Sequence, residues 1–169
     1  MNLSTLFSRK TSWAALLIVF FLCTAEECTS AQDDVPVGCS EPLQQGLRGV
    51  VTFKSGNLMP GPDLDPRAAA GQPVVREVYI FPLTKLSEAF ATEAPFYDSL
   101  ATEPIAVAQS DSTGCFQVRL PAGHYSVFVR EKDRYYANGF DGDGYIFPVD
   151  IEEDEVTDIS FDIDYEAAY

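Results

Sequence analysis

Histidine and basic side chains are the scarcest functional groups in this chain of 169 residues. His124 is the single histidine, so a histidine-based zinc site or a Ser/His/Asp triad has very little to draw on. Lysine and arginine number 11 against 26 aspartates and glutamates, which gives a formal net charge of -15. Because a chain this acidic repels nucleic-acid phosphates and anionic lipid headgroups, we expect no nucleic-acid partner.

The apolar run from Trp13 to Leu22 is too short to cross a bilayer. Two basic residues precede it and small, polar residues follow, which is typical of a signal peptide over residues 1–22, with cleavage after residue 25 or 31 as alternatives. Cys23 follows the run directly, as the lipidated cysteine of a bacterial lipoprotein does, although Leu22 is bulkier than the residue usual before it. We therefore expect an exported protein, either an outer-membrane lipoprotein held by a lipid anchor or a periplasmic or cell-surface protein.

Residues 23–45 are acidic and small and show no periodicity, which indicates a flexible tether before the folded domain. Cys39 lies near the end of this tether. In an oxidising compartment the cysteines of a mature domain tend to pair, and the candidates for a disulfide are Cys39 and Cys115. Cys28 is left over unless cleavage follows residue 31, so the alternative stays open that Cys115 is simply a small strand residue.

Alternating apolar residues predict β-strands throughout residues 46–169. Two such runs, 116–120 and 125–129, flank the turn Pro121-Ala122-Gly123 and together predict a β-hairpin. A second turn at 111–114 implies a preceding strand over 105–109, and therefore a meander.

Four further strands are predicted at 47–53, 74–83, 145–151 and 156–165. The strand at 74–83 is apolar on both faces, as a central strand would be. The last strand places Asp158, Asp162 and Asp164 on the face opposite its apolar residues, which indicates a solvated edge strand. A long loop is expected at 55–73, a short helical turn at 86–91 and a loop at 95–100. The chain thus predicts one all-β domain, an antiparallel prealbumin-like or Ig-like sandwich of about seven strands, without a repeat or second domain.

The pattern Asp-x-x-Gly-x-Phe-x-Val-x-Leu-Pro-Ala-Gly-x-Tyr-x-Val-x-Val, from Asp111 to Val129, resembles the carboxypeptidase regulatory-like domain. That family is a transthyretin-like β-sandwich common in exported bacterial proteins. Gly49-Val50-Val51 is similar to the Gly-x-Val of its first strand, and the resemblance spans roughly residues 46–165, within a domain assigned to 46–169. The long first connection departs from the family pattern. The resemblance implies the sandwich fold and a non-catalytic role in most contexts.

Related sandwich domains of bacterial adhesins join a first-strand lysine to a last-strand asparagine or aspartate through a covalent bond. Lys54 lies at the end of the first predicted strand, and Asp162 and Asp164 lie on the last. The resemblance therefore suggests a covalent cross-link between Lys54 and one of these aspartates. The alternative is that these residues are ordinary exposed charges.

The stretch 134–144 interleaves aromatic and polar residues with glycines and is the best candidate for a binding surface. Tyr135 and Tyr136 with Asn138 are predicted to offer stacking and hydrogen bonds to a sugar. In the alternative interpretation, the aromatics close the end of the sandwich.

Asp141-Gly142-Asp143-Gly144 begins like a calcium loop. The following residues depart from the EF-hand pattern, because Ile146 replaces the glycine required at the sixth position. Asp141 and Asp143 are still candidates for a looser calcium site, and no other cofactor is expected. In the alternative, the Gly-Asp pairs turn the chain.

These observations predict a non-catalytic, envelope-associated binding or scaffolding module whose partner is an unknown envelope protein or glycan. The alternatives are an accessory subunit of a secreted peptidase or glycan-processing system, and a calcium- or carbohydrate-binding domain. An enzyme needs positioned acids, bases or nucleophiles, and the sequence alone pairs none of the many carboxylates across the fold.

Overall fold

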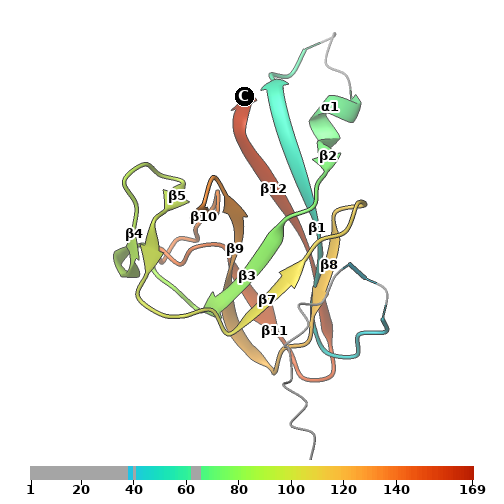
Figure 1. Ribbon diagram of the computed structural model, residues 1–169, viewed down its shortest axis with the longest axis vertical. Helices are drawn as coiled ribbons and strands as arrows, with labels where there is room; N and C mark the ends of the chain where they lie inside the picture. The colour runs from blue at the N-terminus through green and yellow to red at the C-terminus, as the bar shows by residue number, and fades with distance from the viewer. Residues whose placement is uncertain (1–37, 40, 62–65) are drawn as a thin grey trace, which may run out of the picture. The chain divides into compact units, whose positions relative to one another are not determined.

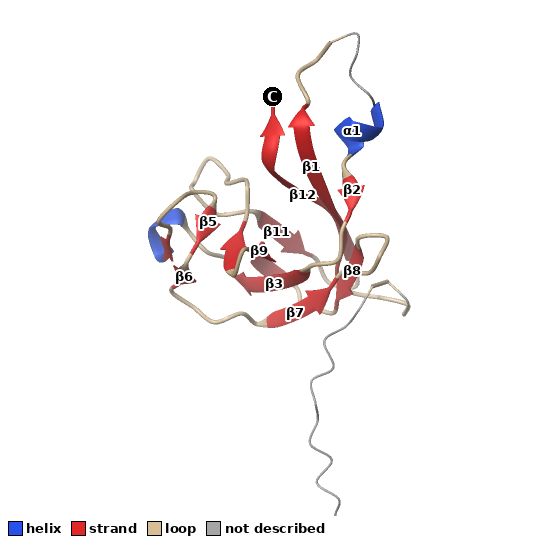
Figure 2. Ribbon diagram, turned by 45° about the horizontal axis from the view of Figure 1, so that its top comes forward, coloured by secondary structure: helices blue, strands red, loops and turns tan. Residues whose placement is uncertain are grey.

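The structure, a computed structural model, describes residues 38, 39, 41–61 and 66–169. The described residues form twelve strands: β1 (Gly46–Asn57), β2 (Gln72–Pro73), β3 (Glu77–Pro82), β4 (Ala89–Phe90), β5 (Phe96–Tyr97), β6 (Ser99–Leu100), β7 (Ala106–Gln109), β8 (Cys115–Val118), β9 (Gly123–Glu131), β10 (Arg134–Tyr136), β11 (Pro148–Ile151) and β12 (Val156–Ala168). Two short helical segments, blue in Figure 2, are α1 (Pro66–Ala70) and the 3-10 helix η1 (Leu86–Glu88). None of the described helices is long and apolar enough to cross a membrane.

Most of the strands form the two sheets of a β-sandwich (Figure 1). In one sheet β1 lies between β12 on one side and β2 and β8 on the other. The other sheet has the order β5-β10-β9-β3-β7, with β11 also paired to β9, while β4 and β6 form a separate pair. One apolar core contains buried residues of both sheets, among them Leu47 and Phe161 from the first and Ile80 and Val127 from the second. The predicted all-β sandwich is confirmed.

The first and last strands, β1 and β12, lie side by side and run parallel (Figure 1). Their register extends from Gly46 opposite Val156 to Asn57 opposite Ala168. This is the one parallel pair among the described strands, so antiparallel pairing does not extend to the whole sandwich. A parallel pair needs a long crossover, and here the rest of the domain supplies it. β12 ends its sheet, as predicted for an edge strand.

The hairpin predicted around residues 121–123 is wrong. β8 pairs with β1 and β9 pairs with β3, so this turn carries the chain from one sheet to the other. The meander is wrong for the same reason, because β7 belongs to the sheet of β9 and not to that of β8. The hydroxyl of Tyr125 donates to the carbonyl of Pro121 at 2.9 Å and closes the turn. A tight Pro-Gly connection can join strands of different sheets as well as hairpin neighbours, and alternation does not distinguish the two.

The central position predicted for the strand at 74–83 is confirmed, since β3 lies between β7 and β9. β9, in contrast, is buried on both faces and not half-buried as predicted: Phe128 and Val129 are both fully inaccessible. Phe128 points to the outer side of the sheet, where its ring packs edge-on against Phe81 and Tyr97. This outer face is covered by the segment between β3 and β7, which we call the 83–105 excursion.

The two segments predicted as loops contain more regular structure than expected. In the first, β1 continues to Asn57, and α1 and β2 follow it. In the second, the predicted helical turn at 86–91 is the shorter η1, and β5 and β6 occupy the region predicted as loop at 95–100. These strands are two residues long, too short for periodicity to detect.

Candidate functional site

Several sequence predictions fall on residues 1–37, which lie outside the described residues. They are the signal peptide over 1–22, lipidation at Cys23 and most of the tether over 23–45. The fate of Cys28 is outside them as well.

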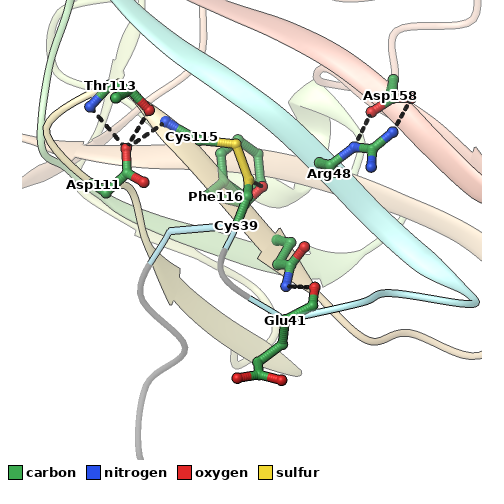
Figure 3. The surroundings of a disulfide bond; sticks show 9 residues. Cys39, Glu41, Arg48, Asp111, Thr113, Cys115, Phe116 and Asp158 are labelled. Carbon is green, nitrogen blue, oxygen red and sulfur yellow. Dashed lines mark hydrogen bonds and ion pairs between the residues drawn. A yellow bond between two sulfur atoms is a disulfide. The ribbon is translucent and has the colours of Figure 1, made fainter.

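Cys39 and Cys115 are joined by a disulfide, with their Cα atoms 5.7 Å apart (Figure 3). The bond fastens the end of the predicted tether to the first residue of β8. Two hydrogen bonds hold the same segment: the amide of Gly38 donates to the carbonyl of Gln109, and the side chain of Gln117 donates to the carbonyl of Glu41 at 2.6 Å. The structure thus brings together the two cysteines that the sequence paired.

The tight turn before Cys115 is built by Asp111 (Figure 3). One carboxylate oxygen of Asp111 accepts bonds from the amide and hydroxyl of Thr113 and from the amide of Cys115. These donors, the Thr113 hydroxyl first, hold the pKa of Asp111 below its usual value. Gly114 takes a φ of 77°, and a Cβ there would lie 2.4 Å from the carbonyl oxygen of Val51. The turn that positions the cysteine therefore requires glycine.

Tyr135 and Tyr136, predicted as a joint stacking platform, lie on opposite faces of β10. Tyr136 points into the core and is fully inaccessible. Tyr135 points to the outer face, where its ring packs edge-on against Tyr79 and Phe81. Because neighbours on a strand face opposite ways, no ligand can stack on both rings. The structure does not form the predicted sugar platform from these two side chains.

Tyr136 and Asn138 are instead joined through a third residue, Asp164 of β12. The Tyr136 hydroxyl donates to Asp164 Oδ1 at 2.8 Å, and the Asn138 side chain donates to the same oxygen. Burial raises the pKa of Tyr136 well above its usual range. The hydroxyl of Tyr169 donates to Asp164 Oδ2 at 2.8 Å, and this bond is the main cause that raises the pKa of Tyr169 to about 12. The cluster fastens the end of β12 to β10.

A bulge in β12 allows Asp164 to reach this cluster. Phe53 pairs with Ile163 and Ser55 with Glu166, so Asp164 and Tyr165 both lie opposite Lys54. An extra residue in one strand re-aims the side chains around it. The carboxylates predicted as one row on β12 therefore contact two different strands. Asp164 accepts a hydrogen bond from β10, while Asp158 and Asp162 contact β1.

Asp158 and Asp162 form ion pairs with basic residues of β1. Arg48 makes two contacts with Asp158, at 2.6 and 2.8 Å (Figure 3). The Arg48 hydrogen bond holds the pKa of Asp158 below its usual value. Lys54 Nζ lies 2.6 Å from Asp162 Oδ2, with 17% of the lysine side chain exposed. Lys54 is thus in direct contact with Asp162, one of the two aspartates named for a cross-link, whereas Asp164 bonds Tyr136. The covalent bond stays a prediction.

Asp141 and Asp143, the candidate calcium ligands, lie in a turn that Asp141 stabilises itself. Asp141 Oδ1 accepts the amides of Asp143 and Tyr145 at 3.0 and 2.8 Å. In the part of the chain that the structure describes, no three histidine, cysteine or acidic residues gather as a metal site. The turn explains the Gly-Asp pattern without a metal. Calcium binding stays a prediction, and no further ligand is grouped with these two residues.

The feature most suited to binding is a groove of about 260 Å³ beside the predicted platform. It lies between the 83–105 excursion and the segment that follows β10. Its lining residues are Leu86, Ala94, Pro95, Tyr97, Ala137, Asn138, Gly139 and Phe140. Two of them are exposed apolar side chains at its rim, Leu86 at 40% and Phe140 at 66%.

Backbone hydrogen bonds fix both walls of this groove. The amide of Leu86 donates to the carbonyl of Gly144 at 2.9 Å, and the amide of Ala137 donates to Pro95 at 3.4 Å. The ring of Tyr97 packs edge-on against Phe128 of β9. The groove therefore has a rigid floor. Sequence reasoning did not find it, although Phe140, an aromatic residue between Gly139 and Asp141, was a visible signal.

A second depression, of about 430 Å³, lies at the opposite end of β9. It is lined by Gln44, Gln45, Arg119, Leu120, Pro121 and Asp154. The side chain of Gln45 is already bonded to the carbonyl of Leu120 and the amide of Asp154. The Gln45 side chain in this depression therefore joins the start of β1 to the two turns around it.

The described residues show no arrangement of acid, base and nucleophile. His124 pairs with Asp150 at 2.5 Å, but both side chains are about 70% exposed on the surface of the sheet. Glu131 is the one buried carboxylate among the described residues, and Arg76 and Tyr165 bind it. Neither group lines the groove.

Comparisons of the chain with protein-family models, curated proteins and solved structures found no match. The resemblance to the carboxypeptidase regulatory-like domain therefore stays a prediction, and the groove itself must carry the functional inference.

Proposed function

We propose that this protein is a non-catalytic, exported module that binds or scaffolds an envelope partner through the groove. The groove carries the proposal, because two exposed apolar side chains, Leu86 and Phe140, flank a rigid apolar floor. Exposed apolar surface beside a pocket is typical of an interaction site. A domain related to the carboxypeptidase regulatory-like family would fit such an accessory role.

The proposed compartment rests on two features from different parts of the chain. The layout of residues 1–22 is that of an export signal. The Cys39–Cys115 disulfide is typical of proteins outside the reducing cytoplasm. We propose in addition that Cys23 carries the lipid anchor. Radiolabelled palmitate is expected to enter the wild type but not Cys23→Ser, whereas an unlabelled mature protein that begins at residue 26 or 32 would contradict the anchor.

The binding role is tested by affinity capture from envelope extract. Wild type and Phe140→Ala are immobilised in parallel, and the captured proteins are identified by mass spectrometry. Phe90→Ala is the matched control, because Phe90 is also an exposed phenylalanine, at 65%, and does not line the groove. A partner that Phe90→Ala retains and Phe140→Ala loses is the expected result. Identical captured sets for all three proteins would contradict the proposed use of the groove.

A further inference from the structure

We propose that the groove receives one apolar side chain of a partner polypeptide in which basic residues flank that side chain. This inference rests on the proposed function and names the chemistry of its partner. Three properties of the groove carry it: its size, the polarity of its lining and the charge around its rim.

The size and lining favour a side chain over a sugar. A volume of about 260 Å³ lies below the roughly 300–1,000 Å³ typical of small-molecule sites, so it suits a single anchoring group. A sugar needs several polar partners at once. The lining offers few, and the Asn138 side chain already donates to Asp164. An apolar side chain would instead bury its surface against Leu86, Pro95 and Phe140 and release their hydration water.

Each segment that lines the groove carries an acidic residue one or two positions from a lining residue, and we call these four residues the acidic rim. Glu88 belongs to the same short helix as Leu86, Glu93 precedes Ala94, Asp98 follows Tyr97 and Asp141 follows Phe140.

Lys85 of the 83–105 excursion and Arg134 of the adjoining strand β10 both have partners. Lys85 Nζ lies 4.7 Å from the centre of the Tyr145 ring, and Arg134 contacts Glu93 at 3.5 Å. The four carboxylates outnumber these two cations, so the groove is expected to attract a ligand that is apolar at its centre and positive at its flanks. A second copy of this chain is disfavoured, because each copy carries a net charge of -15 and would bring a like-charged rim.

The probe is a short fluorescent peptide with a central phenylalanine between lysines, and binding to the full mature chain is followed by fluorescence anisotropy. Two further peptides replace the lysines by glutamates or the phenylalanine by alanine. Only the first is expected to bind, and more weakly as salt increases. Loss of an anchoring contact of this kind weakens binding by about thirtyfold, which is the change expected for Phe140→Ala and not for Phe90→Ala.

The rim is tested separately with Glu88→Gln combined with Glu93→Gln. The control is Glu152→Gln with Glu153→Gln, two exposed carboxylates on the turn between β11 and β12, which adjoins the far end of β9. Weaker peptide binding for the rim variant alone supports the inference. Circular dichroism and melting curves verify that each variant is folded.

Each failure separates this inference from the proposed function. Equal binding of the lysine- and glutamate-flanked peptides overturns the basic partner and leaves the apolar groove in place. If no peptide binds while capture from envelope extract still depends on Phe140, the peptide class is wrong and the binding role stands. If the chain self-associates and Phe140→Ala makes it monomeric, the occupant is a second copy and the inference falls.

Discussion

Replacing both Cys39 and Cys115 by serine is expected to lower the free energy of unfolding by about 4 to 5 kcal/mol. The bond joins residues 76 apart in sequence. In the chain-entropy model, closing a loop of that length lowers the conformational entropy of the unfolded chain by about 15 cal/mol/K. At about 298 K this entropy loss corresponds to a stabilisation of about 4 to 5 kcal/mol. The loop encloses every strand from β1 to β7, so most of the sandwich benefits from it.

The folded state is expected to change little, because hydrogen bonds from Gly38 and Gln117 still hold the stapled segment. Equilibrium urea unfolding, followed by circular dichroism, measures the effect. For a slope of about 2 kcal/mol/M, the midpoint is expected to fall by about 2 M. The slope itself is expected to rise, since the unfolded chain without the bridge exposes more surface.

Reductant provides the control for this prediction. It is expected to reproduce the shift in the wild type and to leave the double variant unchanged. An equal midpoint for the wild type and the double variant would refute the reasoning, as would alkylation of both thiols in the wild type without prior reduction.

Three further predictions follow from the contacts of β12 and β10. Tyr136→Phe removes a buried hydroxyl that donates to a carboxylate and is expected to destabilise by about 1 to 3 kcal/mol in thermal or urea unfolding; no change would show that the bond contributes nothing. Because Arg48 lowers the pKa of Asp158, the stabilisation of the fold by this ion pair is fully present at a pH above the usual pKa of 3.8, and it is lost as the pH falls through the lowered pKa. Arg48→Ala is expected to return the pKa of Asp158, measured by NMR titration, toward 3.8. A Lys54–Asp162 amide would make the intact protein one water lighter than its sequence, and Lys54→Arg is expected to restore the full mass; equal agreement with sequence for both proteins excludes the bond.

Alternation of apolar residues located the main strands because it reports which face of a strand is buried. The strands predicted at 47–53, 74–83 and 156–165 correspond to β1, β3 and β12. Alternation does not report which strand lies next to which, and that is why the hairpin at Pro121 was wrong. The partner of β8 is β1, a strand more than sixty residues earlier in the chain.

The groove was not predictable from periodicity, because its walls come from three irregular segments around Leu86, Pro95 and Phe140. The placement of Tyr135 and Tyr136, in contrast, follows from the period of a strand once β10 is recognised. That strand is three residues long, which is too short for periodicity to detect.

The parallel pairing of β1 with β12 constrains how the chain folds. Arg48 of β1 and Asp158 of β12 are separated by 110 positions in the sequence. Nearly the whole domain must therefore be synthesised before β1 can pair with β12. Contacts of such long sequence separation close late and slow folding. A chain interrupted before residue 156 would leave one edge of β1 without a neighbour, so the sheet of β1 is completed only after β12 has been made.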